Sequence, residues 1–183
     1  MVSEKYRTGE CFSVEKRNYL ILFAEMSRLK KKDILAEKNE MSALIYSDKG
    51  WLLSEEAFSI YSKCMYHATY EDFKAQMDIY LSNPSVKVFV YEEQDNKAAM
   101  MVLDTSGNTA EIIGIAVSDK FQHKGIGKQL IQSVMESDNL ESIKAQTDDD
   151  SIGFYRKCGF TDERVEIEYP DGIAVRYNCV LCK

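Results

Sequence analysis

The spacing of hydrophobic residues first changes about halfway along the chain. Before that point they recur every three or four residues, in residues 12–30, 54–64 and 69–81. This period predicts three amphipathic helices. Thr69 opens the last of them and is followed three residues later by Asp72, which indicates a capped helix N-terminus.

After that point the period becomes two, which indicates β-strands. The segments VKVFVYE (86–92) and AAMMVL (98–103), joined by a QDNK turn, predict an antiparallel hairpin. The next segment, AEIIGIAV (110–117), is apolar at nearly every position. Such a run predicts a central strand that is covered on both faces.

Both periods alternate in the rest of the chain. A helical stripe over 126–135 precedes the strand LESIKAQT (140–147), then come a short helix (150–158) and a hairpin built around PDG (160–181). Because a helix connects them, the strands at 110–117 and 140–147 are expected to be parallel neighbours. The sequence therefore predicts an α/β domain with a central mixed sheet flanked by helices. Ligands bind at the carboxyl edge of such parallel strands.

The first 50 residues differ in character from the remainder. Their helical pattern continues into a highly charged run, KKKDILAEKNE (30–40), and SALIYSD (42–48) is consistent with a short strand. We interpret residues 1–50 as an N-terminal helical extension and residues 51–183 as the main domain. A charged run of this kind is typical of a solvated helix face, and a dimerisation arm that would make the protein a homodimer is the alternative.

Composition narrows the classes of function. The net charge of −7 argues against a nucleic-acid-binding protein, because such affinity comes from lysine and arginine displacing counterions. An acidic protein suits a cationic substrate, although an acidic surface also serves solubility alone. No signal peptide opens the chain and no apolar run is long enough to span a membrane, so we expect a cytoplasmic protein without a membrane partner.

The five cysteines do not predict a disulfide framework or a metal site. They are odd in number and scattered, as in proteins of a reducing compartment. Cys179 and Cys182 form a CxxC, but residues three apart on a strand face opposite sides, and no second Cys/His pair follows. Cys158 offers a thiol without a recognisable histidine partner, so a buried structural thiol is the interpretation rather than a nucleophile.

The stretch FQHKGIGKQLI (121–131) places Gly125 and Gly127 where a helix should begin. Glycines at a helix N-terminus allow a phosphate to approach the unpaired backbone N–H groups. A simple glycine turn is the alternative. Four basic residues surround the glycines in this otherwise acidic chain: Lys120, His123, Lys124 and Lys128.

The segment AEIIGIAVSDKFQHKGIGKQLI, followed by FYRKCGF, resembles the GNAT superfamily of acyl-CoA-dependent N-acetyltransferases, over about residues 54–182. In that family a Gln or Arg, two residues, Gly, one residue, and Gly or Ala hold the coenzyme pyrophosphate, and Gln122, Gly125 and Gly127 match this pattern. The resemblance implies a GNAT-type fold, acetyl-CoA as the acyl donor and no metal. The implied coenzyme-binding residues are Ile115, Ala116, Val117, Gln122, His123, Lys124, Gly125, Ile126, Gly127, Lys128, Asp148 and Ser151.

The resemblance also implies catalytic roles. Tyr155 takes the place of the family's general acid, which gives a proton to the departing thiolate; without the motif it would be interpreted as a core tyrosine. Glu111 lies at the position of the general base of some members, among apolar residues that would strengthen it as a base, unless it faces solvent. Many members carry Asn where this chain has Asp148, and a carboxylate cannot donate the family's hydrogen bond to the coenzyme.

The sequence therefore predicts an N-acetyltransferase that transfers the acetyl group of acetyl-CoA to a primary amine, by direct attack in a ternary complex. The amine belongs to a small molecule or a peptide. A non-catalytic acyl-CoA-binding sensor or interaction module on the same fold is the alternative. Tyr155 separates the two, because binding alone needs no proton donor at that place.

Overall fold

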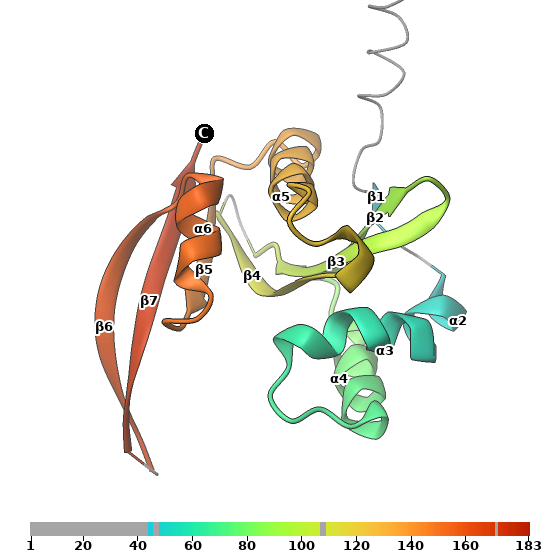
Figure 1. Cartoon of the computed structure of the whole chain (residues 1–183), viewed down its shortest axis with the longest axis horizontal. Helices are drawn as coiled ribbons and strands as arrows, with labels where there is room; N and C mark the ends of the chain where they lie inside the picture. The colour runs from blue at the N-terminus through green and yellow to red at the C-terminus, as the bar shows by residue number, and fades with distance from the viewer. Residues whose placement is uncertain (1–43, 46–47, 107–108, 171) are drawn as a thin grey trace, which may run out of the picture. The chain divides into compact units, whose positions relative to one another are not determined.

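The computed structural model describes residues 44–45, 48–106, 109–170 and 172–183 (Figure 1). The chain divides into two units, residues 1–41 and 42–183, and every described residue belongs to the second. The predicted helix over 12–30 and the charged run after it lie outside the described residues. The N-terminal extension, its boundary at residue 50 and the homodimer thus stay predictions.

The helices predicted at 54–64 and 69–81 are both present. They are α3 (Glu55–Tyr61), which passes into the 3-10 turn η1 (Ser62–Cys64), and α4 (Tyr70–Ser82). A short helix that the periodicity did not predict, α2 (Lys49–Leu52), precedes them, because four residues are too few to show a period.

The capping box predicted at the start of α4 is confirmed. The Thr69 hydroxyl accepts a hydrogen bond from the Asp72 amide at 3.1 Å, and the Asp72 carboxylate accepts one from the Thr69 amide at 3.2 Å. These two bonds satisfy backbone donors that a helix N-terminus leaves without an intrahelical partner.

One mixed sheet in the order β1-β2-β3-β4-β5-β7-β6 organises the domain. Its strands β4 and β5 are parallel, and its other neighbours are antiparallel, as predicted. The strands are β1 (Leu44–Ile45), β2 (Val86–Glu93), β3 (Asn96–Asp104), β4 (Thr109–Val117), β5 (Ser142–Thr147), β6 (Thr161–Tyr169) and β7 (Gly172–Cys182). Between them lie η2 (Asp119–Phe121), α5 (Ile126–Ser137) and α6 (Ile152–Cys158).

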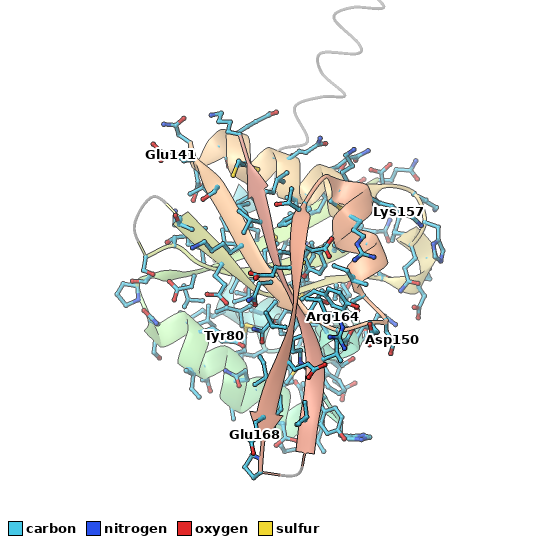
Figure 2. The ribbon with its side chains drawn as sticks, turned by 90° about the vertical axis from the view of Figure 1, so that its left-hand side faces the viewer. Tyr80, Glu141, Asp150, Lys157, Arg164 and Glu168 are labelled. Atoms are coloured by element: carbon cyan, nitrogen blue, oxygen red, sulfur yellow. The ribbon has the colours of Figure 1, made fainter. Side chains whose placement is uncertain are left out.

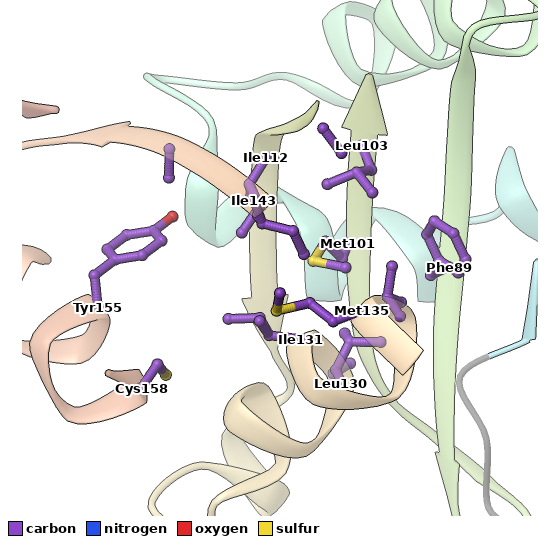
Figure 3. Close-up of a cluster of buried hydrophobic side chains, with 14 of the residues drawn as sticks. Phe89, Met101, Leu103, Ile112, Leu130, Ile131, Met135, Ile143, Tyr155 and Cys158 are labelled. Carbon is purple, nitrogen blue, oxygen red and sulfur yellow. The ribbon is translucent and has the colours of Figure 1, made fainter. Parts of the chain in front are cut away.

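Helices cover both faces of this sheet (Figure 1). On one face α5 and α6 pack on a cluster that includes Met101, Leu130 and Ile143, part of which Figure 3 shows. On the other face α3 and α4 pack on a second cluster that includes Phe73 and Met100. Met100 and Met101 are successive residues of β3, so their opposite directions follow from the period of a strand.

Strand β4 departs from the prediction that it is covered on both faces. Ala110 and Ile112 are buried, but Ile113 is 42% exposed, and Ile115 and Val117 are only partly buried. The apolar residues in the second half of β4 therefore do not all belong to the core. They line an open cleft, and this explains why the strand is apolar without being covered.

Candidate active site

The cleft exists because β4 and β5 separate. They pair only from Thr109 with Ser142 to Ile112 with Ala145, and no further residue of β5 pairs with β4. The pairing of β4 with β3 shifts at the same place, so that Ile113 is an extra residue in the ladder. Such a bulge bends and twists its strand. The separation leaves a cleft of about 1130 Å³ between β4, the start of α5 and the start of α6.

One side of this cleft is an open strand edge. Ile115, Ala116 and Val117, predicted to hold the pantetheine arm, all line it. Because β5 does not pair with this part of β4, the backbone groups on that edge have no strand partner. An extended chain with amide groups can bind there as an additional strand would.

The N-terminus of α5 forms the second side. Gly125 is its N-cap, with φ +81°, and no side chain caps the helix. The first-turn N–H groups of Ile126, Gly127 and Lys128 therefore face the cleft without a capping side chain. A Cβ placed on Gly125 would meet nothing within 4 Å, so the space in front of it is open. This arrangement suits an anion.

The two glycines of the loop have different roles. Gly125 is required by its left-handed backbone, which side chains rarely adopt. A Cβ on Gly127 would lie 2.9 Å from Cε2 of Phe154. Gly127 thus allows α5 to pack closely against α6. The backbone of Gly125 is that of a glycine turn, and the phosphate site stays a prediction.

Gln122 holds the shape of this loop through its side chain. Its Nε2 donates to the backbone oxygen of Val117 and to Oδ1 of Asp119, both at 3.1 Å. Asp119 also pairs with Lys63 of η1 at 2.7 Å. The loop is thereby connected to the turn after α3, on the opposite side of the cleft.

The basic residues of the loop are not equivalent. His123, whose φ is 60°, and Lys128 line the cleft. Lys124 does not, and its ammonium lies 5.0 Å from the ring centre of Phe121. The structure therefore brings His123 and Lys128 to the predicted phosphate site and directs Lys124 elsewhere.

Asp148 and Ser151 line the cleft at the start of α6. Oδ1 of Asp148 accepts a hydrogen bond from the Ser151 amide at 3.1 Å. The carboxylate that replaces the family's asparagine thus closes a turn at the helix start. Ser151 also lines the cleft, and its hydroxyl can donate a hydrogen bond where the carboxylate cannot.

Tyr155 lies on α6 with its side chain in the cleft, and its residue is 7% exposed. Its ring packs between Phe154 and Phe160, with centroid distances of 5.1 and 5.2 Å, and its hydroxyl points away from α6 (Figure 3). None of the described residues hydrogen-bonds this hydroxyl. Burial raises the pKa of Tyr155, with smaller contributions from nearby cysteines, so the group stays protonated at neutral pH. It is a proton donor available to a ligand.

Glu111 is not brought together with Tyr155. It is exposed, and it lines a separate hollow near the N-terminal end of β4 with Asp104 and Lys144. The apolar surroundings expected from the sequence are absent because the Glu111 side chain points to the face that is open at that end of the strand. The geometry gives Glu111 no direct access to the cleft.

The sequence did not predict several residues that line the cleft from the side of α3. Among them are Lys63, Cys64 and Tyr66, which come from η1 and the segment after it. Their neighbour on β4 is Gly114, where a Cβ would lie 2.9 Å from Cζ of Tyr61. An isolated glycine inside a strand was the available signal, because it marks a close approach of another group.

The charge of the cleft is opposite to that of the protein. Five basic side chains line it and two carboxylates do, whereas the whole chain carries −7. The basic ones are Lys63, His123, Lys128, Lys157 and Arg176, and the acidic ones are Asp148 and Asp150. The net charge therefore does not indicate what binds here.

The described residues also bear on metal, membrane and thiol chemistry. They contain no group of three or more His, Cys, Asp or Glu that could hold a metal ion. None of its helices is long and apolar enough to cross a membrane. As predicted for the CxxC, Cys179 is buried and Cys182 exposed. Burial raises the pKa of the Cys158 thiol to about 11, so that it is not a nucleophile at neutral pH.

Comparison with known proteins agrees with this geometry. Residues 84–162 match the model of the acetyltransferase (GNAT) domain. The uncharacterised N-acetyltransferase YvbK of Bacillus subtilis strain 168 is 31% identical over 75 residues, which are 38% of this chain and 48% of the relative. The similarity thus spans about half the length of that curated relative.

Solved structures share the fold. A Bacillus subtilis acetyltransferase in complex with CoA superposes with a TM-score of 0.53 at 21% identity, covering 71% of this chain and 93% of that one. The ribosomal-protein-S18-alanine N-acetyltransferase of Escherichia coli gives 0.56 at 16% identity, covering 77% and 91%. Residues 84–162 thus match a GNAT acetyltransferase domain, and the described part of the chain shares the fold of solved acetyltransferases.

Proposed function

We propose that this protein transfers the acetyl group of acetyl-CoA to a primary amine, by direct attack in a ternary complex. The observation that carries the proposal is that one cleft unites an open strand edge, an uncapped helix N-terminus and a protonated tyrosine hydroxyl that no described residue hydrogen-bonds. Each of these three features matches one part of the reaction.

The donor is the first part. Its phosphates fit the first-turn amides of α5, with the Lys128 ammonium and the His123 side chain beside them. Its pantetheine arm carries amides that match the open edge of β4 at Ile115–Val117. These residues orient the acyl donor with its thioester toward Tyr155.

The chemical step needs correct positioning and two proton movements. The amine nitrogen attacks the thioester carbonyl carbon, the carbon–sulfur bond breaks, and the products are an acetamide and a free thiol. Tyr155 gives its proton to the departing sulfur. The amine loses one proton, and because Glu111 lies outside the cleft we assign that transfer to water in the cleft. The same water returns a proton to the Tyr155 phenolate, which restores the starting state. Holding both reactants in one cleft supplies most of the acceleration.

The raised pKa of Tyr155 defines how it acts. A tyrosine with a pKa above its ordinary value of 10.0 is a weaker acid than an unperturbed one. It therefore does not ionise before the reaction, and it gives up its proton only as negative charge develops on sulfur. Such an interaction is stronger in the transition state than in the ground state, which is the condition for catalysis.

Two measurements test the function. Calorimetric titration measures binding of acetyl-CoA, and release of free thiol measures transfer to a panel of polyamines, aminoglycosides, amino acids and peptides. The variant Gly125→Glu puts a carboxylate in front of the uncapped helix, so it should abolish binding of acetyl-CoA. Because any side chain strains this left-handed backbone, Gly125→Gln, which adds no charge, should bind more tightly than Gly125→Glu, and urea unfolding should show that both variants fold.

The matched control is Gly153→Glu, which adds the same charge at an exposed position of α6 that does not line the cleft, with nothing within 4 Å of the new Cβ. It should bind acetyl-CoA as the wild type does. Normal binding by Gly125→Glu would contradict the assigned phosphate site. Binding without acetylation of any amine would favour a sensor of acyl-CoA instead.

A further inference from the structure

Arg176 of β7 is a half-buried cation in the cleft. The other two described arginines form ion pairs, Arg156 with Asp162 at 2.7 Å and Arg164 with Glu166 at 3.0 Å. Arg176 has no carboxylate partner among the described residues; its Nη1 donates only to the Val175 backbone oxygen at 3.0 Å. A guanidinium has five N–H donors in a fork that fits a carboxylate, so most of its capacity is unused.

The register of the sheet places Arg176 on the side of the cleft away from α5. Tyr177 pairs with Thr147, the last residue of β5, so Arg176 lies just past the end of that strand. Tyr177 packs against the cluster beneath α5 and α6, and the alternation of a strand therefore turns Arg176 to the opposite face. This is the face that α3 and α4 cover elsewhere in the sheet.

The acceptor must reach the thioester from that same face. The assigned donor-binding groups, the first turn of α5 and the start of α6, both belong to the other face. The remaining approach passes η1, the residues after it and β7. Arg176 is thus on the path of the amine and not of the phosphates.

The other residues on this approach are mainly apolar or aromatic. Met65, Tyr66 and Ile113 line the cleft, and Tyr66 and Ile113 are 91% and 42% exposed. The hairpin of β6 and β7 continues past the end of β5 to the region of Glu168, where Figure 2 shows it extending beyond α6. The Arg176 guanidinium lies 5.7 Å from the ring centre of Tyr169 on this hairpin.

We propose that Arg176 binds a carboxylate of the acceptor, and that the acceptor is an amino acid with an apolar side chain. The inference rests on the proposed function, because it names the substrate of the same cleft. The guanidinium fork and the carboxylate account for one end of such a molecule, and the apolar residues account for its side chain. The amine, between them, is then directed at the thioester.

The test compares acceptors with and without a carboxylate, among which L-phenylalanine, phenethylamine and phenylalaninamide differ at that group alone. L-Phenylalanine and L-methionine should be acetylated with higher kcat/KM than phenethylamine, phenylalaninamide or spermidine, as measured by release of free thiol. Arg176→Gln should lower kcat/KM for phenylalanine by about 10- to 100-fold, the usual range for a lost hydrogen bond to a charged group. It should leave the rate with phenethylamine unchanged, because that amine has no carboxylate to lose.

Two further variants sharpen the result. Arg164→Gln removes an arginine from the same hairpin that faces the other side and is paired with Glu166, so it should leave every rate unchanged. Arg176→Lys keeps the charge but loses the fork, so it should retain part of the preference for phenylalanine.

The outcomes separate this inference from the proposed function. Equal losses with phenylalanine and phenethylamine, weaker binding of acetyl-CoA by Arg176→Gln, or a preference for spermidine would each overturn the role of Arg176 while leaving an acetyltransferase. Absence of thiol release with every amine would overturn the proposed function and this inference with it.

Discussion

Removal of one oxygen atom from Tyr155 tests the chemical step directly. Tyr155→Phe keeps the ring between Phe154 and Phe160 and removes only the hydroxyl. None of the described residues hydrogen-bonds that hydroxyl, so its removal leaves no protein donor or acceptor unpaired. The variant should therefore fold normally and bind acetyl-CoA as the wild type does.

The expected effects on rate and on stability differ in size. Loss of a positioned general acid lowers the rate by about 10² to 10⁴. At about 1.4 kcal/mol for each factor of ten, this corresponds to roughly 3 to 5 kcal/mol of lost transition-state stabilisation. The free energy of unfolding should change by less than about 1 kcal/mol, the usual value of a hydrogen bond that is in any case absent here.

The assay needs turnover, affinity and stability from one preparation. Release of free thiol under saturating acetyl-CoA gives kcat, calorimetry gives the dissociation constant of acetyl-CoA, and urea unfolding gives stability. Tyr91→Phe is the matched control, since Tyr91 is 6% exposed and donates a hydrogen bond to Oε1 of Gln129 at 2.7 Å outside the cleft. It should lose about 1 kcal/mol of stability and keep its turnover.

The opposite pattern would refute the reasoning. If Tyr155→Phe turns over at the wild-type rate, the hydroxyl carries no proton in the rate-limiting step. If it loses stability or acetyl-CoA affinity to the same degree as turnover, Tyr155 is a structural residue. The decisive comparison is between kcat and the dissociation constant, because an acid acts in the transition state and not in the ground state.

Three further predictions concern the scaffold of the site. Thr69→Ala removes the α4 cap and should lower the free energy of unfolding by about 1 kcal/mol, as measured in urea. Hydrogen bonds from Thr69 lower the pKa of the Asp72 carboxyl, so Asp72→Asn should lower stability only above the pH at which that carboxyl ionises. Gly114→Ala places a Cβ against Tyr61, which is 2% exposed, and should lower the free energy of unfolding by about 1–3 kcal/mol. The double variant with Tyr61→Phe should recover part of this loss, and additive losses would contradict the contact. Burial raises the pKa of both Tyr61 and Tyr155 above 10.0, so their contribution to stability should be complete below about pH 10 and decline above it, which unfolding curves between about pH 8 and pH 11 would show.

The sequence by itself determined the elements, and it predicted many of the residues that line the cleft. Periods of two and of three to four predicted the described strands and all but one of the α-helices, because burial of one face imposes these periods on any amphipathic element. The cap of α4 and the left-handed Gly125 at the start of α5 depend on local backbone chemistry, which the residues themselves reveal. Tyr155 was identifiable only because a motif surrounds it.

Tertiary structure alone decided which predicted residues meet. Glu111 and Tyr155 are both reasonable on chemical grounds, yet they lie in different hollows. Glu111 stands where β4 still pairs with β5, and the cleft opens only after Ile112, next to the bulge at Ile113. No local pattern marks a bulge of that kind, which arises from the pairing of β4 with β3.

The acceptor side depends on tertiary structure for the same reason. Arg176 lies far in the sequence from Lys63 and Tyr66, and no motif connects it to them. The separation of β4 from β5 brings them to one cleft, where the local charge is opposite to that of the whole chain. Net charge is a sum over all residues, whereas a ligand responds mainly to the side chains within a Debye length of about 10 Å. Which side chains lie within that distance depends on the tertiary structure.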